Sequence, residues 1–279
     1  MGRPSLYVVA TPIGNLADIT LRALDVLKRV DIIAAEDTRF ALRLLKHYGI
    51  TSHLISLHEH NERSTAQKLI GSLAQGKSIA LISDAGTPAI SDPGALAVAE
   101  VRDAGYAVVP VPGANAAICA LSAAGLAAPH FLFYGFLPQQ AAARKRELAA
   151  LKALPHLLVF YEAPHRVAAS VAAMEAVLGD RTITIARELT KLFETIHRCR
   201  LPDAAAWFAA DENQRKGEFV LLVEGAPPAA APAAGAAQRV LEVLMRELSL
   251  KQAVKLAVEL TGARKNDVYE LALELDKRT

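Results

Sequence analysis

Residues 83–94 combine acidic, hydroxyl, glycine and proline residues in a pattern that suits ligand binding. The segment reads SDAGTPAISDPG and follows an apolar run at residues 78–82 that has the composition of a buried strand. Small residues let a ligand approach the backbone, and turns leave N–H groups free to bind it. Open parallel sheets bind their ligands at the carboxyl ends of such strands. The alternative is a plain tight connection, because Asp-Pro-Gly forms turns in any context.

Further short motifs at the ends of expected strands also combine polar or charged side chains with glycine or proline. They occupy residues 11–15, 36–39, 58–61, 112–115, 161–166, 187–191 and 216–218. A purely structural protein has no need for so many motifs of this kind, so together they indicate a binding cleft between two domains. Their mixed charges suit a zwitterionic or cationic cofactor and an anionic substrate.

Motif spacing excludes several common sites. No G-x-G-x-x-G follows a strand, which removes a dinucleotide site and the usual methyltransferase fingerprint, and no P-loop motif is present. His58-Glu59-His60 offers two imidazoles, but zinc normally requires a third protein ligand with supporting hydrogen bonds. We therefore predict no metal site and interpret these histidines as part of a polar cleft wall.

The first half of the chain alternates apolar runs with segments of helical spacing. Strands are expected at residues 6–10, 31–35, 54–57, 78–82 and 106–111, and helices at residues 20–29, 40 to about 47, 62–74 and 95–104. Strands that alternate with helices of this length predict a parallel sheet with both faces covered.

In the second half, few long helices separate the later strands. Strands are expected at residues 131–135, 157–161, 182–186, 193–199 and 219–224, with helices at residues 139–151 and 167–177. This order predicts a mixed sheet. The predicted fold class is α/β, with a parallel-sheet N-terminal domain (residues 1–113) and a mixed-sheet second domain (residues 114–225).

The C-terminal part has a different composition. Residues 226–237 are almost wholly Ala, Pro and Gly and are interpreted as a linker, and helices are expected at residues 238–248, 251–260 and 266–275. Ser249 is a good N-cap for the middle helix, and Thr261-Gly262 is a good stop. Residues 238–279 are therefore predicted to be a small helical domain, either a helix-turn-helix or a three-helix appendage that packs on its own chain or on a partner.

Composition places the chain among globular proteins. It is 52% hydrophobic, and its net charge of +2 permits an anionic partner without requiring one. Two cysteines provide neither a disulfide framework nor zinc spacing. No signal-peptide pattern is seen, and the longest apolar stretch, residues 114–136, is interrupted by Gly125 and Pro129. We therefore expect a cytoplasmic protein without a membrane segment.

The ordered motifs carry a resemblance to a known family. The segments LYVVATPIGNL, EDTR, HEHNE, LISDAGTPAISDPG, PGANA, FYGFLP, YEAPHR, ARELTKLFE and GEFVLLVEG occur in this order across residues 5–225. They resemble the ribosomal RNA small subunit methyltransferase I family, a branch of the tetrapyrrole-methylase superfamily. The resemblance implies a homodimer that binds S-adenosylmethionine in the interdomain cleft. It also implies methylation of a cytidine ribose 2′-hydroxyl in 16S ribosomal RNA, at the decoding centre of the small subunit.

The resemblance also implies which residues bind the cofactor. Ser83-Asp84-Ala85 stands where tetrapyrrole methylases carry Gly-Asp-Pro, a departure that fits the RNA branch and argues against a tetrapyrrole substrate. The full set of implied cofactor residues is Pro12, Ser83, Asp84, Ala85, Thr87, Asn115, Ala116, Tyr161, Ala186, Gly217 and Glu218.

Methyl transfer to a ribose hydroxyl requires alignment of the reacting groups, and a base or a nearby cation helps the weakly acidic hydroxyl to attack. The candidates for this role are Glu162, His165, Glu188 and Lys191, with Arg187 as a further cation. Arg39, Arg166 and Arg187 suit phosphate contacts because a guanidinium matches that geometry, and His60 and Asn61 suit hydrogen bonds to a base or ribose edge. For each of these side chains, the alternative is an interdomain ion pair or a helix-end contact.

Two other classes of function stay open at this point. One is a methyltransferase of the same superfamily that acts on a tetrapyrrole or on a protein residue. The other is a non-catalytic RNA-binding module, against which the number of cleft motifs argues. The modest net charge favours the assembled small subunit over naked RNA as the substrate.

Overall fold

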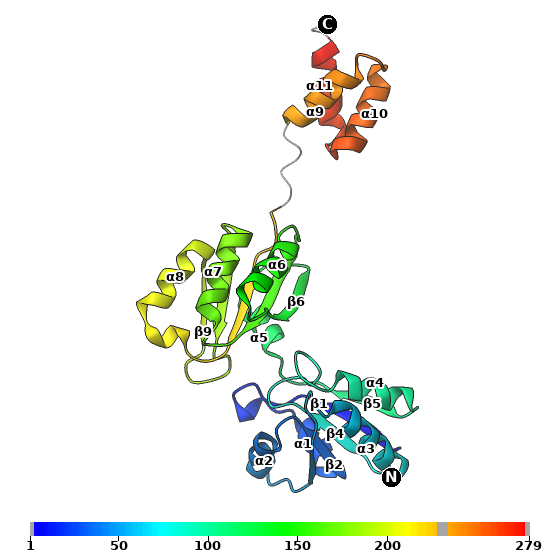
Figure 1. Ribbon diagram of the computed structural model, residues 1–279, viewed down its shortest axis with the longest axis vertical. Coiled ribbons are helices and arrows are strands. Elements are labelled where there is room, and N and C mark those ends of the chain that lie inside the picture. Colours follow the sequence, from blue (N-terminus) through cyan, green and yellow to red (C-terminus); the bar gives the residue numbers. More distant parts are fainter. Residues whose placement is uncertain (1–2, 228–233, 277–279) are drawn as a thin grey trace. The chain divides into compact units, whose positions relative to one another are not determined.

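A computed structural model describes residues 3–227 and 234–276 (Figure 1). The chain divides into two compact units. The larger unit holds both sheets and consists of the chain up to Lys152 and of His156–Glu224. The smaller unit consists of the chain from Gly225 onward, which contains the C-terminal helices, and of the short segment Ala153–Pro155. Within the described residues, no helix is long and apolar enough to cross a membrane.

The first sheet is parallel throughout, as the sequence predicts. Its strands lie in the order β3-β2-β4-β1-β5. Their bounds are β1 (Ser5–Val9), β2 (Ile32–Ala35), β3 (His53–Ser56), β4 (Ile79–Ile82) and β5 (Ala107–Val111). All residues of β2 and β4 are buried, which explains their continuous apolar sequences. The loops that follow the five strands therefore meet at one edge.

Two helices cover each face of this sheet. Their bounds are α1 (Leu21–Arg29), α2 (Thr38–His47), α3 (Glu62–Ala74) and α4 (Ala95–Asp103). One core joins α1 and α2 to the side chains of Val9, Ile33 and Ile82, and the other joins α3 and α4 to those of Leu6 and Leu81. A short 3-10 helix, η1 (Leu16–Asp18), precedes α1.

The start of α4 is capped by a side chain from another helix. Gly94, the N-cap residue, has no side chain to offer, and Glu62 Oε1 instead accepts hydrogen bonds from the N–H groups of Gly94, Leu96 and Ala97 at 2.8–3.1 Å. A carboxylate is favoured there because it satisfies free N–H groups and lies at the positive end of the helix dipole.

We expect Glu62→Ala to lower the free energy of unfolding by about 1–2 kcal/mol, because three N–H groups lose their acceptor. Urea unfolding followed by circular dichroism measures this loss. The control is Glu59→Ala, which removes an exposed carboxylate three residues earlier and is expected to change stability by less than about 0.5 kcal/mol. Equal stabilities of the two variants would contradict the capping role.

The second sheet is mixed, also as predicted. Its strands lie in the order β6-β7-β10-β8-β9, and their bounds are β6 (Phe131–Phe136), β7 (Leu157–Glu162), β8 (Thr182–Arg187), β9 (Thr195–Arg200) and β10 (Phe219–Val223). The β6–β7 pair is parallel and the other pairs are antiparallel. The register of β6 shifts between Phe133 and Gly135, where the backbone of Gly135 has a φ of +80°.

Four helices accompany the second sheet, and the sequence prediction missed two of them. The predicted helices are α6 (Ala141–Leu151) and α7 (Val167–Leu178), and the missed ones are α5 (Ala116–Ala123) and α8 (Leu201–Ala210). Both missed helices are rich in alanine and show no alternation of apolar and polar faces. The helices α6, α7 and α8 pack side by side, whereas α5 packs on β7 and β10 with a separate core (Figure 1). A 3-10 helix, η2 (Glu212–Arg215), follows α8.

The smaller unit is a three-helix cluster made of α9 (Ala234–Leu244), α10 (Leu250–Thr261) and α11 (Lys265–Asp276) around a core that includes Leu241 and Ala257. The predicted N-cap is confirmed, since Ser249 and Gln252 form a capping box, and Gly262 ends α10 with a φ of +65°. The first helix begins four residues earlier than the predicted residue 238, inside the predicted linker, because alanine favours helix. Residues 228–233 of that linker lie outside the described residues, and the proposed domain boundaries stay predictions.

Candidate active site

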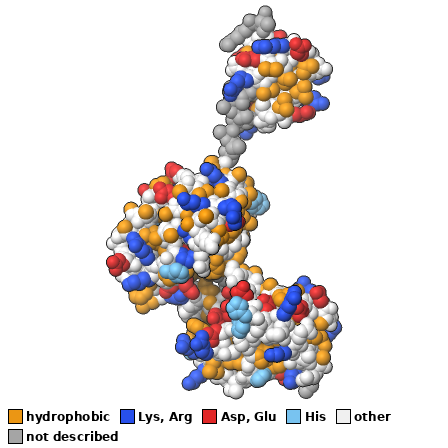
Figure 2. All heavy atoms as spheres, in the orientation of Figure 1, with side chains coloured by type: hydrophobic (Ala, Val, Ile, Leu, Met, Phe, Trp, Pro, Cys, Tyr) orange, Lys and Arg blue, Asp and Glu red, His pale blue; other side chains and the backbone are white. Residues whose placement is uncertain are grey.

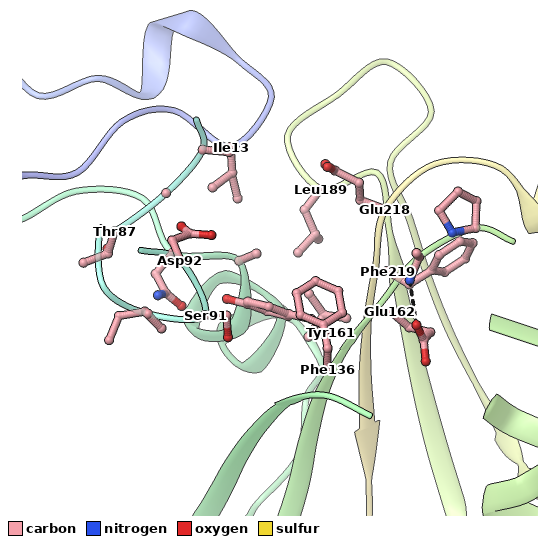
Figure 3. A pocket seen from close by; sticks show the side chains of 18 residues that line it. Ile13, Thr87, Ser91, Asp92, Phe136, Tyr161, Glu162, Leu189, Glu218 and Phe219 are labelled. Carbon is pink, nitrogen blue, oxygen red and sulfur yellow. Dashed lines mark hydrogen bonds between the residues drawn. The ribbon is translucent and has the colours of Figure 1, made fainter. Parts of the chain in front are cut away.

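A cavity of about 290 Å³ lies where loops of the first sheet meet the second sheet (Figure 3). Residues from both halves of the larger unit line it. From the first half these are Ile13, Ala85, Gly86, Thr87, Ile90, Ser91 and Asp92, and from the second half Asn115, Ala116, Phe136, Tyr161, Glu162, Ala163, Pro164, Leu189, Glu218, Phe219 and Val220. The carboxyl ends of β1, β4 and β5 therefore contribute to one site, as the sequence predicts for a parallel sheet.

Hydrogen bonds join the loops that follow these three strands. Thr11 and Gly86 exchange backbone hydrogen bonds at 2.8 and 3.1 Å. The Thr11 hydroxyl donates to Ser83 O, and the Thr87 hydroxyl donates to Ala114 O. The first-half wall of the cavity is thus a cross-linked structure rather than a set of separate turns.

The end of the β4–α4 loop adopts an uncommon backbone conformation. Ala89 and Ser91 have φ values of +66° and +64° although neither is glycine. Non-glycine residues in this region cost about 1–3 kcal/mol each and persist where the surroundings enforce them. Gly135 lies against this loop, since an added Cβ there would come within 3.0 Å of Ser91 Oγ. The loop is therefore held between the two sheets, and this conformation places Asp92 at the cavity.

Three acidic side chains, Glu36, Asp84 and Asp92, gather at this wall of the cavity. Burial raises the pKa of Asp92 to about 6, and burial together with the nearby Asp92 and Asp84 raises the pKa of Glu36 to about 7. Burial also raises the pKa of Asp84, which accepts a hydrogen bond from the Asp37 N–H at 3.0 Å. Among the residues that line the cavity there are carboxylates but no Lys, Arg or His. The cavity is therefore suited to a ligand that carries positive charge.

A lysine connects two carboxylates at the second-half rim. Lys191 Nζ lies 2.9 Å from Glu188 Oε1 and 2.8 Å from Glu218 Oε2. Burial lowers the pKa of Lys191, but the hydrogen bonds to Glu218 and Glu188 outweigh it, so the pKa lies above its usual value. Lys191 is therefore a cation rather than a base at neutral pH. The same loop lies over Gly14, where an added Cβ would come within 2.5 Å of Lys191 Cγ.

Gly217 leaves the space that Glu188 occupies in this network. Its φ is +91°, and an added Cβ would lie 2.4 Å from three side-chain atoms of Glu188. We expect Gly217→Ala to displace Glu188, separate it from Lys191 and lower the free energy of unfolding by about 2–4 kcal/mol. The control is Gly49→Ala at the end of α2, where φ is +64° but no atom lies within 4 Å, so only the backbone cost of about 1 kcal/mol is expected. Thermal unfolding of both variants measures the difference, and equal losses would contradict the clash with Glu188.

Six of the residues implied as cofactor ligands line the cavity. These are Ala85, Thr87, Asn115, Ala116, Tyr161 and Glu218, whereas Pro12, Ser83, Asp84, Ala186 and Gly217 do not line it. Two of the six also hold helix α5, since Asn115 Oδ1 accepts from the Ile118 N–H and the Tyr161 hydroxyl accepts from the Ala117 N–H. Burial raises the pKa of Tyr161, so its hydroxyl stays protonated at neutral pH.

The catalytic candidates of the YEAPHR motif face different surroundings. Glu162 is 2% exposed. Its carboxylate accepts hydrogen bonds from the Ser170 hydroxyl at 2.5 Å and from the Ala163 N–H at 2.9 Å. It also forms an ion pair with Arg166 at 3.1 Å. Figure 3 shows this carboxylate directed away from the cavity. His165 is exposed and does not line the cavity. Glu162 contacts Arg166 and Ser170 at the start of α7, so its contacts favour the helix-end alternative.

Most substrate candidates are also engaged inside the chain. Arg166 donates to Leu137 O besides pairing with Glu162, and Arg187 is buried and donates to Lys216 O and Phe193 O. The Asn61 side chain closes its own turn, with Oδ1 accepting from the His58 N–H and Nδ2 donating to Ser56 O. Only Arg39 and His60 of this set are exposed. His58 and His60 make an edge contact, and no group of three His, Cys, Asp or Glu side chains in the described ranges could hold a metal ion.

Sequence reasoning missed several lining residues. Ser91 and Asp92 belong to the loop that the sequence singles out and to the family motif, but the residues of this loop that the resemblance implies as cofactor ligands end at Thr87. Ile13, Leu189, Phe136 and Val220 are apolar, and their residue types alone do not distinguish a cavity wall from a core. The acidic residue of the Ser91-Asp92-Pro93-Gly94 turn is the one sequence signal that could have indicated a further lining residue.

Comparisons with known proteins agree with the fold and the motif order. The family model of Tetrapyrrole (Corrin/Porphyrin) Methylases matches residues 5–205, and the model of an RsmI C-terminal HTH domain matches residues 230–276. The second match supports the helix-turn-helix interpretation of α10 and α11. A crystal structure of uroporphyrin-III C-methyltransferase from Thermus thermophilus, complexed with S-adenyl homocysteine, has a TM-score of 0.54 at 19% identity, covering 78% of this chain and 96% of that one. At that identity the likeness concerns the fold.

Curated relatives are much more similar in sequence. The ribosomal RNA small subunit methyltransferase I of Escherichia coli O157:H7 is 52% identical over 270 residues, which cover 96% of this chain and 94% of that protein. The protein of the same name from Pseudomonas aeruginosa is 51% identical, with 98% of each chain covered. With this identity over nearly the whole length, the chain belongs to the ribosomal RNA small subunit methyltransferase I family, within the tetrapyrrole methylases.

Proposed function

We propose that this protein transfers a methyl group from S-adenosylmethionine to the ribose 2′-hydroxyl of a cytidine in 16S ribosomal RNA, at the decoding centre of the small subunit. The family relationship supports the reaction class and the ribosomal RNA substrate. The observation that carries the donor site is the cavity lined by carboxylates, apolar groups and no basic side chain.

The residues of the cavity fit the methyl donor. S-adenosylmethionine carries its methyl group on a positively charged sulfur, and its other parts are an amino acid end with an ammonium and a carboxylate, and an adenosine. Asp92 and Glu218 offer negative charge to the cationic groups, and Ile13, Leu189 and Phe136 offer apolar surface to a ring. Thr87 and Asn115 add polar groups, although each already makes a hydrogen bond that positions its own loop.

Lys191 and Glu188 are proposed to position the rim of this site. Because Glu218 lines the cavity and binds Lys191, the ammonium fixes the orientation of a lining carboxylate. Glu162 is proposed to hold the YEAPHR loop through Arg166 and Ser170. These residues act on alignment, which is the main requirement of a direct methyl transfer.

The test is a methyl-transfer assay with labelled S-adenosylmethionine. Purified small subunits, naked 16S ribosomal RNA and reduced uroporphyrinogen are offered in parallel. The proposal expects label in RNA with a linkage that resists alkali, because a 2′-O-methyl group removes the hydroxyl that alkaline cleavage requires. Label in the porphyrinogen, or no transfer despite donor binding, would reject the proposed substrate.

We also propose that the protein is a cytoplasmic homodimer. Large apolar side chains are exposed on α5, on the β8–β9 connection and on β9. They are Ile118 on α5, Leu192 and Phe193 on the connection, with Leu192 89% exposed, and Ile196 on β9. Exposed large apolar side chains can mark an interaction surface, and a second copy is the partner that the resemblance implies.

We expect Leu192→Ser combined with Phe193→Ser to convert the dimer to a monomer, because these two side chains contribute most of the exposed apolar surface on that connection. Size-exclusion chromatography with light scattering measures the mass. The control is Val243→Ser, which removes an exposed apolar side chain from the smaller unit and is expected to leave the mass unchanged. A monomeric wild-type protein at micromolar concentration would contradict the dimer.

A further inference from the structure

The outer surface of α2 combines basic and apolar side chains that are exposed. Arg39, Phe40, Leu42, Arg43 and Lys46 are all exposed, and we refer to these five residues as the α2 surface. Ala41 and Leu45 of the same helix are buried in the core, so the α2 surface is the solvent side of an amphipathic helix. Phe40 is 53% exposed and Leu42 is 58% exposed. Large apolar side chains at this exposure, interleaved with cations, are characteristic of a binding surface.

The charge of this region is entirely positive over a long stretch of sequence. Residues 38–58 contain Arg39, Arg43 and Lys46, three histidines and no Asp or Glu. Figure 2 shows Lys and Arg side chains at the edge of the first α/β half where α2 lies. The nearest acidic partner is Asp37, which pairs with Arg39 at 2.5 Å, but the Arg39 side chain is 85% exposed. Exposed pairs of this kind contribute little, so a phosphate can replace the carboxylate.

An arginine and an aromatic ring are already paired on this surface. The guanidinium carbon of Arg43 lies 5.4 Å from the centroid of the Phe40 ring. This contact holds the ring on the helix while more than half of the residue stays accessible. Unstacked bases of single-stranded RNA bind to such rings and to arginine planes, whereas double-stranded RNA offers no free base face.

The α2 surface lies next to the proposed catalytic cavity. The N-cap residue of α2 is Asp37, and its N–H donates a hydrogen bond to Asp84 Oδ1 at 3.0 Å. Ala85, which follows Asp84 in the chain, lines the cavity. Among the arginines that the sequence proposes for phosphate contact, Arg166 and Arg187 are engaged within the chain. The exposed cations of α2 are therefore the ones placed to meet the substrate.

We propose that the α2 surface binds a single-stranded segment of the RNA substrate that flanks the target nucleotide, with a base stacked on Phe40 and phosphates on Arg39, Arg43 and Lys46. This inference rests on the proposed function and adds to it the surface that holds the RNA outside the cavity. Leu42 extends the apolar contact beside Arg39, since the two are three residues apart on one helix.

The test compares Phe40→Ala, Phe40→Trp and Arg43→Ala with the wild-type protein. Phe40→Ala is expected to raise the KM for small subunits and the Kd for a single-stranded 16S ribosomal RNA fragment by about 5- to 100-fold. Phe40→Trp is expected to retain wild-type values because it retains the stacking face. Arg43→Ala is expected to weaken RNA binding and to reduce the dependence of log Kd on log salt by about one unit. In all variants the Kd for S-adenosylhomocysteine is expected to stay unchanged.

The control is Phe131→Ala, which removes an exposed phenylalanine from the second sheet and is expected to leave both RNA parameters unchanged. An unchanged Kd for RNA in Phe40→Ala overturns the inference. A change of mass from dimer to monomer in Phe40→Ala also overturns it, because the α2 surface would then belong to a second copy of the chain. The wild-type protein could bind the RNA fragment and yet methylate neither small subunits nor RNA. That result would reject the proposed function, and the RNA-binding comparison of the variants would still decide the inference.

Discussion

Replacing Asp92 by asparagine is expected to weaken the binding of S-adenosylmethionine by about 10-fold or more at pH 8. Asp92 lines the cavity, and its pKa of about 6 leaves the carboxylate charged at that pH. Opposite charges about 4 Å apart interact by a few kcal/mol at an effective dielectric near 20, part of which is lost to desolvation. Isothermal titration calorimetry measures the Kd for the donor.

S-adenosylhomocysteine provides the matched ligand for this experiment, because it has the same adenosyl and amino acid parts but no charge on sulfur. Asp92→Asn is expected to weaken its binding less than that of S-adenosylmethionine. In the wild-type protein, affinity for the donor is expected to fall as the pH is lowered from 8 to 5, because Glu36 takes up a proton near pH 7 and Asp92 near pH 6. The lower of these two steps is expected to disappear in Asp92→Asn. Unchanged affinity for both ligands would remove Asp92 from the donor site.

The same substitution is expected to stabilise the fold at pH 8. The folded-state pKa of Asp92 lies above its usual value of 3.8, so the folded state binds the proton more tightly than the unfolded state does. The charged carboxylate therefore destabilises the fold above pH 6, and this cost disappears as the pH falls through 6 toward 4. After allowance for solvent screening of this partly exposed group, Asp92→Asn is expected to gain about 1 kcal/mol at pH 8 and almost nothing at pH 4. Thermal unfolding at the two pH values measures the difference.

The sequence predicts the sheets well because their signals are local. The strand β4 is a continuous apolar run followed by a loop of Gly, Pro and Asp, and both its burial and its position before the cavity follow from that pattern. Helix α5 was missed because AAICALSA has no polar face to set a period. It packs between the second sheet and the cavity loops, so tertiary contacts rather than periodicity define it.

The side chains of the candidate site are harder to predict, because a charge in a motif does not reveal its partner. Arg187 and Arg39 have the same chemistry in the sequence, yet one is buried against backbone carbonyls and the other is exposed. Asp92 reaches the cavity only because Ala89 and Ser91 adopt positive φ values, which neither residue type favours. Such placements depend on contacts with the second sheet that are far away in sequence.

Replacing Glu162 by glutamine is expected to lower the free energy of unfolding by about 3–5 kcal/mol. Glu162 is 2% exposed and forms a buried ion pair with Arg166. Removing one charge of a buried pair leaves the other without compensation, and the resulting cost is of this size. The substitution also weakens the contacts at the start of α7, because the Glu162 carboxylate accepts hydrogen bonds from the Ser170 hydroxyl and the Ala163 N–H. Urea unfolding of the purified variant measures the change.

Two further variants test whether the unpaired buried charge causes the loss of stability in Glu162→Gln. Glu162→Gln combined with Arg166→Met removes both charges and is expected to recover a large part of the loss, because an apolar side chain needs no counter-charge in the interior. Glu224→Gln breaks the exposed pair with Arg198, whose side chains are 43% and 51% accessible, and is expected to cost less than about 1 kcal/mol. If Glu162→Gln costs no more than Glu224→Gln, Glu162 is not a structural anchor, and its carboxylate becomes available for the catalytic role that the sequence proposes.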